Sequence, residues 1–375
     1  MCGQKTTENR KSVYDHLEER MFEFVPIWGI PVLLLYAMRR VACTDCGVRV
    51  EKVPWAVGKS RLTIAFACYL AEWGKDMSWS KVAQRFKTTW YHVYESIKYV
   101  VNYGKEHRAL SGIKALGIDE IAWRQGHKYL TLVYQIDEGS RRLLWIGRDR
   151  TEKTLTGFFD WFQEKRTKRL KYICSDMWKP YLKVIRAKAG NALNILDRFH
   201  IMANLNKALD EVRRQEAARL TKEGKDVVLK HTRWCILKRV KNLTGKQCER
   251  LSELLKMNLK TVKAYLMKED FQRFWEYRSA IWAGKFMDGW CGRVRRTRIE
   301  PLKKMARSLE THRPLLLNWF KAKGEYSSGI VEGLNNKAKT TIKMAYGYRH
   351  VETLEVALYH TLGCLPVPKV THRFF

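Results

Sequence analysis

The region 114–197 restricts the fold more than any other part of the sequence, because its apolar residues alternate between two periodicities. Three extended apolar runs come first. They are followed by a helical stretch at about 152–167, a fourth strand, a proline-containing helix from Trp178, and a fifth strand that ends at Asp197. Short apolar runs separated by helical patterns indicate a sheet connected by helices. This order predicts an α/β domain with a mixed five-stranded sheet.

The residues that follow, 198–323, show no strand-like alternation. They are charged and leucine-rich, as in "LSELLKMNLKTVKAYLM", and their periodicity predicts a large all-α insertion. Residues 325–362 close the chain with one helical pattern that is broken near Gly347. At the other end, 22–60 reads as extended runs punctuated by proline and glycine.

Between 60 and 101 the spacing is helical, and two short helices are joined by a tight turn. The first lies in "SWSKVAQRF" and the second begins after "KTT". This arrangement fits a helix-turn-helix, whose second helix would enter the DNA major groove. An ordinary three-helix packing unit fits the pattern equally well. The side chains that the second helix would present to DNA are Thr89, Tyr91, His92 and Lys98.

The charge balance points to a polyanionic partner. Lysine and arginine total 71 against 38 aspartate and glutamate, which gives a net charge of +33. Such an excess opposes compaction unless a polyanion neutralises it, and each phosphate contact also releases a condensed counterion. Nucleic acid is therefore the expected partner. Basic stretches such as 165–171 and 292–304 would lie along its backbone. Charge alone also fits another basic protein, such as a ribosome-associated factor.

Targeting signals are absent from the sequence pattern. The longest apolar stretch, 25–38, contains two prolines and is shorter than the roughly 20 residues of a membrane helix. The N-terminal residues lack the apolar core of a signal peptide. Nine cysteines in no paired framework suit a reducing compartment. We expect a cytoplasmic protein, associated with the nucleoid if it binds DNA.

Three carboxylates stand at defined places in the predicted elements. Asp119 lies inside the first strand of the sheet and Asp176 directly follows the fourth, so adjacent strands would bring them to one edge. Glu332 begins the last long helix. Asn335 and Lys339, three and seven positions later, share its helical face.

Paired carboxylates suit metal-dependent phosphodiester chemistry. Two divalent ions about 3.5–4 Å apart activate an oxygen nucleophile and stabilise an oxygen leaving group, and magnesium prefers oxygen ligands. Each acid also has a structural explanation: one of the neighbours Asp119 and Glu120 would be a solvated rim residue, Asp176 would cap a helix, and Glu332 would complement a helix dipole. Their combination in a chain of charge +33 favours the functional explanation.

Six segments resemble DDE transposases with a ribonuclease H-like core, most closely the ISL-three family of bacterial insertion sequences. They are "RRVACTDCGVRVEKVPWA" (39–56), "MSWSKVAQRFKTTW" (77–90), "GIDEIAWRQGHKYLTLVYQID" (117–137), "ICSDMWKPYLKVI" (173–185), "LDRFHIMANLNKALD" (196–210) and "VEGLNNKAKTTIKMAYGYR" (331–349). The resemblance implies that Asp119, Asp176 and Glu332 bind Mg²⁺ or Mn²⁺. It also implies recognition of terminal inverted repeats, strand cleavage and strand transfer, by at least a dimer on DNA.

The resemblance also implies a division of the chain. Its parts are a zinc-ribbon-like β segment (1–59), a helix-turn-helix (60–110), the ribonuclease H-like core (111–200 and 325–375) and a helical insertion (201–324).

An Asp-x-x-His signature, Asp197 to His200, matches several insertion-bearing transposase families and implies that His200 lies near the active site. The alternative is structural, with Asp197 capping a helix and His200 orienting a neighbour. At the C-terminal end, we expect Tyr346 and Tyr348 to pack, or to stack on DNA beside Arg349. Asn335 and Lys339 are further candidate DNA contacts.

The N-terminus departs from the family pattern. Family members carry two Cys-x-x-Cys-Gly units that bind zinc, and here the later pair is intact as Cys43 and Cys46, whereas upstream only Cys2 remains. Three thiolates leave a tetrahedral zinc site incomplete unless His16, water or another group serves. Either the chain begins a few residues late or the zinc site has decayed.

Two other functions remain open on the sequence. One is a catalytically inactive repressor or architectural protein derived from a transposase, and the other is a nuclease of the same fold without transposition. No substitution is visible in the three acids, which favours the enzyme.

Overall fold

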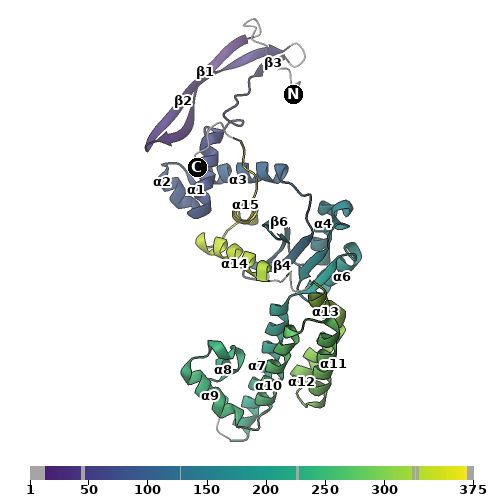
Figure 1. The fold of residues 1–375 in the computed structure, drawn as a ribbon. Coiled ribbons are helices and arrows are strands. Elements are labelled where there is room, and N and C mark those ends of the chain that lie inside the picture. The colour runs from purple at the N-terminus through teal and green to yellow at the C-terminus, as the bar shows by residue number, and fades with distance from the viewer. Residues whose placement is uncertain are drawn as a thin grey trace. The chain divides into compact units, whose positions relative to one another are not determined.

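The computed structural model of the protein describes residues 13–43, 47–126, 128–224, 228–322, 326 and 329–369 (Figure 1). The chain divides into two compact units, one formed by 1–110 together with 337–375 and the other by 111–336. The strands and helices follow the predicted order throughout. No helix in the described ranges is long and apolar enough to cross a membrane.

The first unit begins with an antiparallel ribbon. Its strands are β1 (Val13–Ile27), β2 (Ile30–Cys43) and β3 (Gly47–Val50), paired in that order. Trp28 and Gly29 form the two-residue turn between β1 and β2, both with positive φ, as in the turns that match the twist of a hairpin. Phe22 is the centre of a small core at the base of the ribbon. The prediction of extended structure is confirmed for these strands.

Three helices follow the ribbon, as predicted. They are α1 (Ile64–Asp76), α2 (Trp79–Arg85) and α3 (Trp90–His107). Each begins after a hydroxyl residue, Thr63, Ser78 or Thr89, whose side chain accepts a hydrogen bond from the first turn of the helix. At the end of the chain, α15 (Val351–Leu362) packs against α3 in the same unit.

The second unit contains a five-stranded mixed sheet of order β6-β5-β4-β7-β8. Its antiparallel strands are β4 (Ala115–Arg124), β5 (Lys128–Asp137) and β6 (Ser140–Arg148). Its parallel strands are β7 (Tyr172–Ser175) and β8 (Leu193–Leu196), which extend the sheet from β4. The predicted mixed α/β class is confirmed.

Helices cover both faces of this sheet (Figure 1). One face carries α4 (Glu152–Phe162) and α6 (Lys179–Lys188), which pack together, and the other carries the start of α14 (Gly329–Met344). The single helix expected over 152–167 is interrupted, because Gln163 has a φ of 70° and ends α4 before the short α5 (Glu164–Thr167).

Between β8 and α14 the described residues form only helices, as predicted. They are α7 (Arg198–Lys222), α8 (Arg233–Leu237), η2 (Val240–Asn242), α9 (Gly245–Leu255), α10 (Lys260–Gln272), η3 (Arg273–Glu276), α11 (Ala280–Arg296), α12 (Glu300–Thr311) and α13 (Arg313–Lys321). Their shared core is built around fully buried Trp290, Phe271 and Phe274. The helices join the sheet through α13, where Asn318 donates a hydrogen bond of 2.8 Å to the carbonyl of Asn194.

Candidate active site

Strand register aligns three aspartates in the second unit. Gly117 of β4 pairs with Cys174 of β7, and Cys174 pairs with Ile195 of β8. Two residues further along, Asp119 is still in β4, whereas Asp176 and Asp197 directly follow β7 and β8, and the same register brings the three side by side. The predicted meeting of Asp119 and Asp176 is therefore explained by the parallel pairing of their strands.

Asp119 is the most enclosed of the predicted ligands. Its Oδ1 accepts a hydrogen bond of 2.8 Å from the backbone N–H of Glu120, and its Oδ2 accepts one of 2.6 Å from Nδ2 of Asn335. Burial raises the pKa of Asp119 to about 6. The negative charges of Asp176 and Asp197 add to this rise, whereas the Glu120 N–H and the charge of His200 oppose it.

Asp176 lies at the start of the connection to α6. Its Oδ1 accepts a hydrogen bond of 2.9 Å from the N–H of Trp178, the residue that precedes the helix. Burial raises the pKa of Asp176, while the Trp178 N–H and His200 lower it. Asp176 therefore both accepts a hydrogen bond just before α6 and lies beside Asp119.

Glu120 is an acid that the sequence pattern treated only as a possible rim residue. Burial raises its pKa to about 7, and the charges of Asp176 and Asp119 raise it further. Its Oε1 lies 3.4 Å from Nη1 of Arg150, and its buried Oε2 has no hydrogen-bond partner among the described residues. The only signal in the sequence was its place next to Asp119.

Arg150 is held against two aromatic rings. Its guanidinium carbon lies 4.0 Å from the ring centre of Tyr129 and 5.0 Å from that of Trp178. These cation–π contacts hold in place the guanidinium that faces Glu120. The guanidinium also lowers the pKa of Asp176, while His200 lowers that of both Asp119 and Asp176.

Helix α14 approaches the sheet closely at Gly117. A Cβ on Gly117 would lie 2.3 Å from Cγ2 of Val331, so only glycine permits this contact. One helical turn after Val331, Asn335 is 4% exposed, donates to Asp119 and accepts a hydrogen bond of 2.7 Å from the Tyr134 hydroxyl. Both ends of the Asn335 amide are therefore hydrogen-bonded inside the protein. The sequence had indicated a contact with DNA for this side chain.

Glu332 has a different environment from Asp119 and Asp176. It lies in the first turn of α14 and is exposed, and within the described ranges it makes no hydrogen bond or ion pair. Its assignment as a third ligand stays a prediction. In the part of the chain that the structure describes, no three His, Cys, Asp or Glu side chains gather closely enough to hold a metal ion.

The aligned Asp119, Asp176 and Asp197, here called the aspartate row, together with the neighbouring Glu120 nevertheless offer donors that suit a divalent cation. Asp119, Asp176 and Glu120 are enclosed carboxylates whose pKa is raised by burial, the charge of Asp176 raises the pKa of the other two further, and a cation nearby would relieve this repulsion. The unpartnered Oε2 of Glu120 is a buried acceptor with no donor. Hard oxygen donors of this kind are those that magnesium prefers.

Asp197 and His200 lie at the start of α7. Asp197 caps the helix by accepting a hydrogen bond of 2.6 Å from the N–H of Phe199, so the predicted capping role is confirmed. His200 is half-exposed, and its Nε2 is 3.8 Å from Oδ2 of Asp197. Its charge also lowers the pKa of both Asp119 and Asp176, which places it beside them.

The predicted DNA contacts of α3 lie in the first unit. The Thr89 hydroxyl accepts a hydrogen bond from the His92 N–H, the His92 ring contacts Thr88 at 3.0 Å, and Lys98 pairs with Glu95 at 3.3 Å. Tyr91 is exposed. Lys339 and Arg349 are exposed as well. Their contacts with DNA stay predictions.

The predicted zinc ligands fall mostly outside the described residues, since Cys2 and Cys46 both do. Cys43 ends β2 and is not in a disulfide, and His16 is exposed on β1. Nothing in these positions tests the zinc site.

Comparison with known proteins gives one consistent result. A family model of ISL3 transposases, described as "Transposase", matches residues 116–358, which include every residue of the aspartate row. The transposase of insertion sequence IS1001 from Bordetella parapertussis is 29% identical over 94% of this chain and 85% of its own length. The transposase of IS1557 from Mycobacterium tuberculosis is 26% identical over 90% of this chain and 80% of its own length.

Proposed function

This chain belongs to the ISL3 transposase family, and from that premise we propose that it binds the terminal inverted repeats of an insertion sequence and catalyses metal-dependent DNA cleavage and strand transfer. The observation that carries the proposal is the row of Asp119, Asp176 and Asp197 across three adjacent strands. The +33 charge supports DNA as substrate. The bacterial relatives are named as insertion-sequence transposases.

The core is proposed to be ribonuclease H-like. Three antiparallel strands followed by two parallel strands, with helices on both faces, support this assignment. The helices of 201–324 are then an insertion between β8 and the helix that carries Glu332. The region 60–110 is proposed to be a helix-turn-helix and 1–59 a zinc-ribbon-like segment. DNA-bound copies are proposed to pair as a dimer.

In this proposal Asp119, Asp176 and Glu332 hold Mg²⁺ or Mn²⁺. A bound pair of such ions would help to activate an attacking oxygen and to stabilise a leaving oxygen. Asn335 fixes the orientation of the Asp119 carboxylate through its 2.6 Å hydrogen bond. Asp197 positions the first turn of α7, and His200, half-exposed beside Asp119 and Asp176, is available to bind the scissile phosphate.

No covalent protein–DNA intermediate is part of this scheme. The nucleophiles are water in the cleavage step and the freed 3′-hydroxyl in the joining step. The tyrosines nearest the acids in the second unit are structural: Tyr134 donates to Asn335, and the Tyr181 hydroxyl is hydrogen-bonded to Thr131.

The proposal is tested on a duplex that carries the element's terminal repeat. Asp119→Asn should bind this DNA as the wild type does and should lose cleavage with Mg²⁺ or Mn²⁺. Asp160→Asn is the matched control, because Asp160 is an exposed aspartate on α4 paired only with Lys188. Equal cleavage by Asp119→Asn and the control would overturn the assignment. Binding with no cleavage by the wild type would indicate a repressor.

A further inference from the structure

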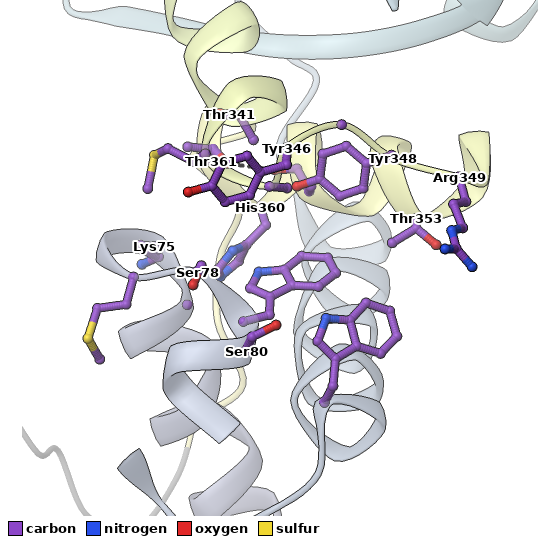
Figure 2. A pocket seen from close by; sticks show the side chains of 18 of the residues that line it. Lys75, Ser78, Ser80, Thr341, Tyr346, Tyr348, Arg349, Thr353, His360 and Thr361 are labelled. Atoms are coloured by element: carbon purple, nitrogen blue, oxygen red, sulfur yellow. Dashed lines mark hydrogen bonds between the residues drawn. The ribbon is translucent and has the colours of Figure 1, made fainter. Parts of the chain in front are cut away.

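A hollow lies in the first unit, whereas the aspartate row belongs to the second. It is a cavity of about 400 Å³ within the size range of small-ligand pockets, roughly 300–1,000 Å³. Its walls come from the α1–α2 connection, the first residue of α3, the last turn of α14 and the segment 345–361. Figure 2 shows Ser80 on one side and Tyr346 and Tyr348 on the other, with the His360 ring reaching toward Ser78.

Aromatic rings form much of the cavity wall. The Trp79 ring lies 5.8 Å from that of Trp90 and 6.3 Å from that of Tyr348, centre to centre. Trp90 stacks on Tyr94 at 5.4 Å with 8° between the planes, which fixes its orientation, yet 44% of Trp90 stays exposed. A rigid, half-exposed indole at a cavity is a surface on which a planar ligand can stack.

His360 supplies a polar group at the floor of the same cavity. The imidazole is hydrogen-bonded to the backbone of Ala71, and its buried Nε2 has no partner among the described residues. Burial lowers the pKa of His360 to about 4, so the ring is neutral at ordinary pH. Because the Ala71 bond occupies one ring nitrogen, the unpartnered Nε2 is the nitrogen left to accept an N–H from a ligand, which reaches this buried atom once neighbouring side chains shift.

The rim of the cavity suits a phosphate. Helix α15 begins after His350 with no side-chain cap, and Thr353 in its first turn lines the cavity. Arg349 precedes this helix start, is exposed, and forms no ion pair within the described ranges. A helix start without a side-chain cap, with a guanidinium beside it, attracts an anion, although the charge of Glu352 in the first turn opposes this.

Tyr346 lies at the mouth of the cavity and has an unfavourable backbone conformation. Its N–H donates to the carbonyl of Lys343 and that of Gly347 donates to Ile342, so Tyr346 occupies the left-handed position of a helix-ending motif. Its φ is 54°, a region that favours glycine, and its side chain is fully exposed. A tyrosine held in this conformation has a ring free to close over a ligand.

We propose that the cavity receives one unpaired nucleobase of a DNA strand, stacked on Trp90 and hydrogen-bonded to Nε2 of His360, with its phosphate at the start of α15. A nucleotide combines the three features that the walls select: a planar ring, an edge N–H and an attached anion. The inference rests on the proposed function for the choice of DNA as the polymer. A free mononucleotide shares this chemistry, and the test separates the two.

The test uses 5-iodouracil as a photo-cross-linking base in three DNAs. These are a short single strand, a fully paired duplex, and a duplex with the iodouracil unpaired in an overhang. We expect the single strand and the overhang to cross-link to peptides that contain Trp79, Trp90, Tyr346 or Tyr348, and the paired base not to. Cross-links that map only elsewhere would overturn the proposal. Thymidine monophosphate that competes as well as the oligonucleotide would also overturn it.

Tyr346→Gly separates binding from folding. Glycine relieves the positive φ, so thermal stability should be unchanged or higher, while affinity for the single strand should fall about tenfold through loss of one stacking ring. Trp282→Ala, which removes an exposed tryptophan of α11 in the other unit, should change neither property. Wild-type single-strand affinity in both Tyr346→Gly and Trp90→Ala would contradict the proposal. Cavity cross-links in a protein that never cleaves element ends would support it and overturn the proposed function.

Discussion

Nδ2 of Asn335 donates a hydrogen bond of 2.6 Å to Oδ2 of Asp119, which links two residues 216 positions apart in the chain. Tyr134 donates to the other end of the same amide at 2.7 Å, so the orientation of the amide is fixed from β5. The carboxylate of Asp119 is therefore positioned by a neighbouring strand and by α14 together. In the proposed function, Asn335 is a positioning residue for a metal ligand.

The first prediction concerns this contact. Asn335→Ala leaves the buried Tyr134 hydroxyl without its acceptor and Asp119 without its donor, at a cost of about 1–3 kcal/mol in the free energy of unfolding. Cleavage should fall while duplex binding is kept. Urea unfolding and end cleavage measure the two effects. Asn336→Ala, at the exposed neighbouring position, is the control, and an equal loss in both variants would contradict the prediction.

The second prediction concerns the close approach of α14. Gly117→Ala places a methyl group 2.3 Å from Cγ2 of Val331 and should destabilise the fold by about 1–3 kcal/mol while displacing Asn335 from Asp119. Val331→Ala in the same chain should restore part of the loss, a coupling that a double-mutant cycle measures. Gly157→Ala in α4 meets no atom within 4 Å and should be neutral or stabilising.

Gly117 and Val331 also show what the sequence could and could not predict. The order of strands and helices along the chain and the all-helical stretch follow from periodicity and were correct, as was the expectation that adjacent strands carry Asp119 and Asp176. The rotation of α14 about its axis is set by the contact at Gly117. Periodicity therefore could not say that Asn335 turns inward while Glu332 stays exposed.

Glu120 was missed for a related reason. The sequence offered only the alternative that one of the two neighbouring acids, Asp119 and Glu120, is a solvated rim residue. In the structure α4 and α6 cover one face of the sheet, and Glu120 is enclosed beside Arg150. The enclosure depends on helices more than thirty residues away, which no local pattern around position 120 encodes.

The third prediction follows from the pKa of Glu120. The ordinary value of 4.5 is raised to about 7 by burial, so the folded protein binds this proton more tightly than the unfolded chain. The contribution of this bound proton to the free energy of unfolding is complete below about pH 4.5. It is lost as the pH rises through about 7. With metal removed, the free energy of unfolding of Glu120→Gln should exceed that of the wild type by about 1–2 kcal/mol near pH 8. Near pH 4 the two should be equal.

The measurement is urea unfolding of both proteins in chelator across this pH range. His360 acts in the opposite sense, because its lowered pKa removes stability as the pH falls below about 6.5. The effect of His360 is the same in the wild type and in Glu120→Gln. The difference between their free energies of unfolding therefore reports on Glu120. A difference that is independent of pH would contradict the raised pKa.

The fourth prediction tests Glu332 as a metal ligand. Because Glu332 is exposed and unpaired within the described ranges, Glu332→Gln should leave metal-free stability unchanged. In Mg²⁺, however, the variant should lose end cleavage, and it should show a smaller rise in melting temperature than the wild type, because a ligand that binds only the folded state stabilises it. Wild-type cleavage by Glu332→Gln would leave Asp119, Asp176 and Glu120 as the acids to consider.

The fifth prediction concerns the electrostatic contact with DNA. A chain of charge +33 that contacts six to ten phosphates should lose about 10³–10⁵ in duplex affinity between roughly 50 and 200 mM salt. The helical region offers a matched comparison. Arg296 and Arg298 are exposed and form no ion pair within the described ranges, whereas Arg293 and Arg295 are paired with Asp270 and Glu310. An arginine already paired with a carboxylate has less charge to offer a phosphate.

If this surface follows the DNA backbone, Arg296→Gln with Arg298→Gln should therefore lower the slope of log affinity against log salt by up to about 0.9 for each phosphate that the variant no longer neutralises. The paired set, Arg293→Gln with Arg295→Gln, should lower it less. Filter binding or anisotropy in chelator measures both slopes without competition from divalent ions. Equal slopes in the wild type and the Arg296 and Arg298 double variant would remove this surface from the DNA path, and a flat wild-type response would contradict the extended electrostatic contact itself.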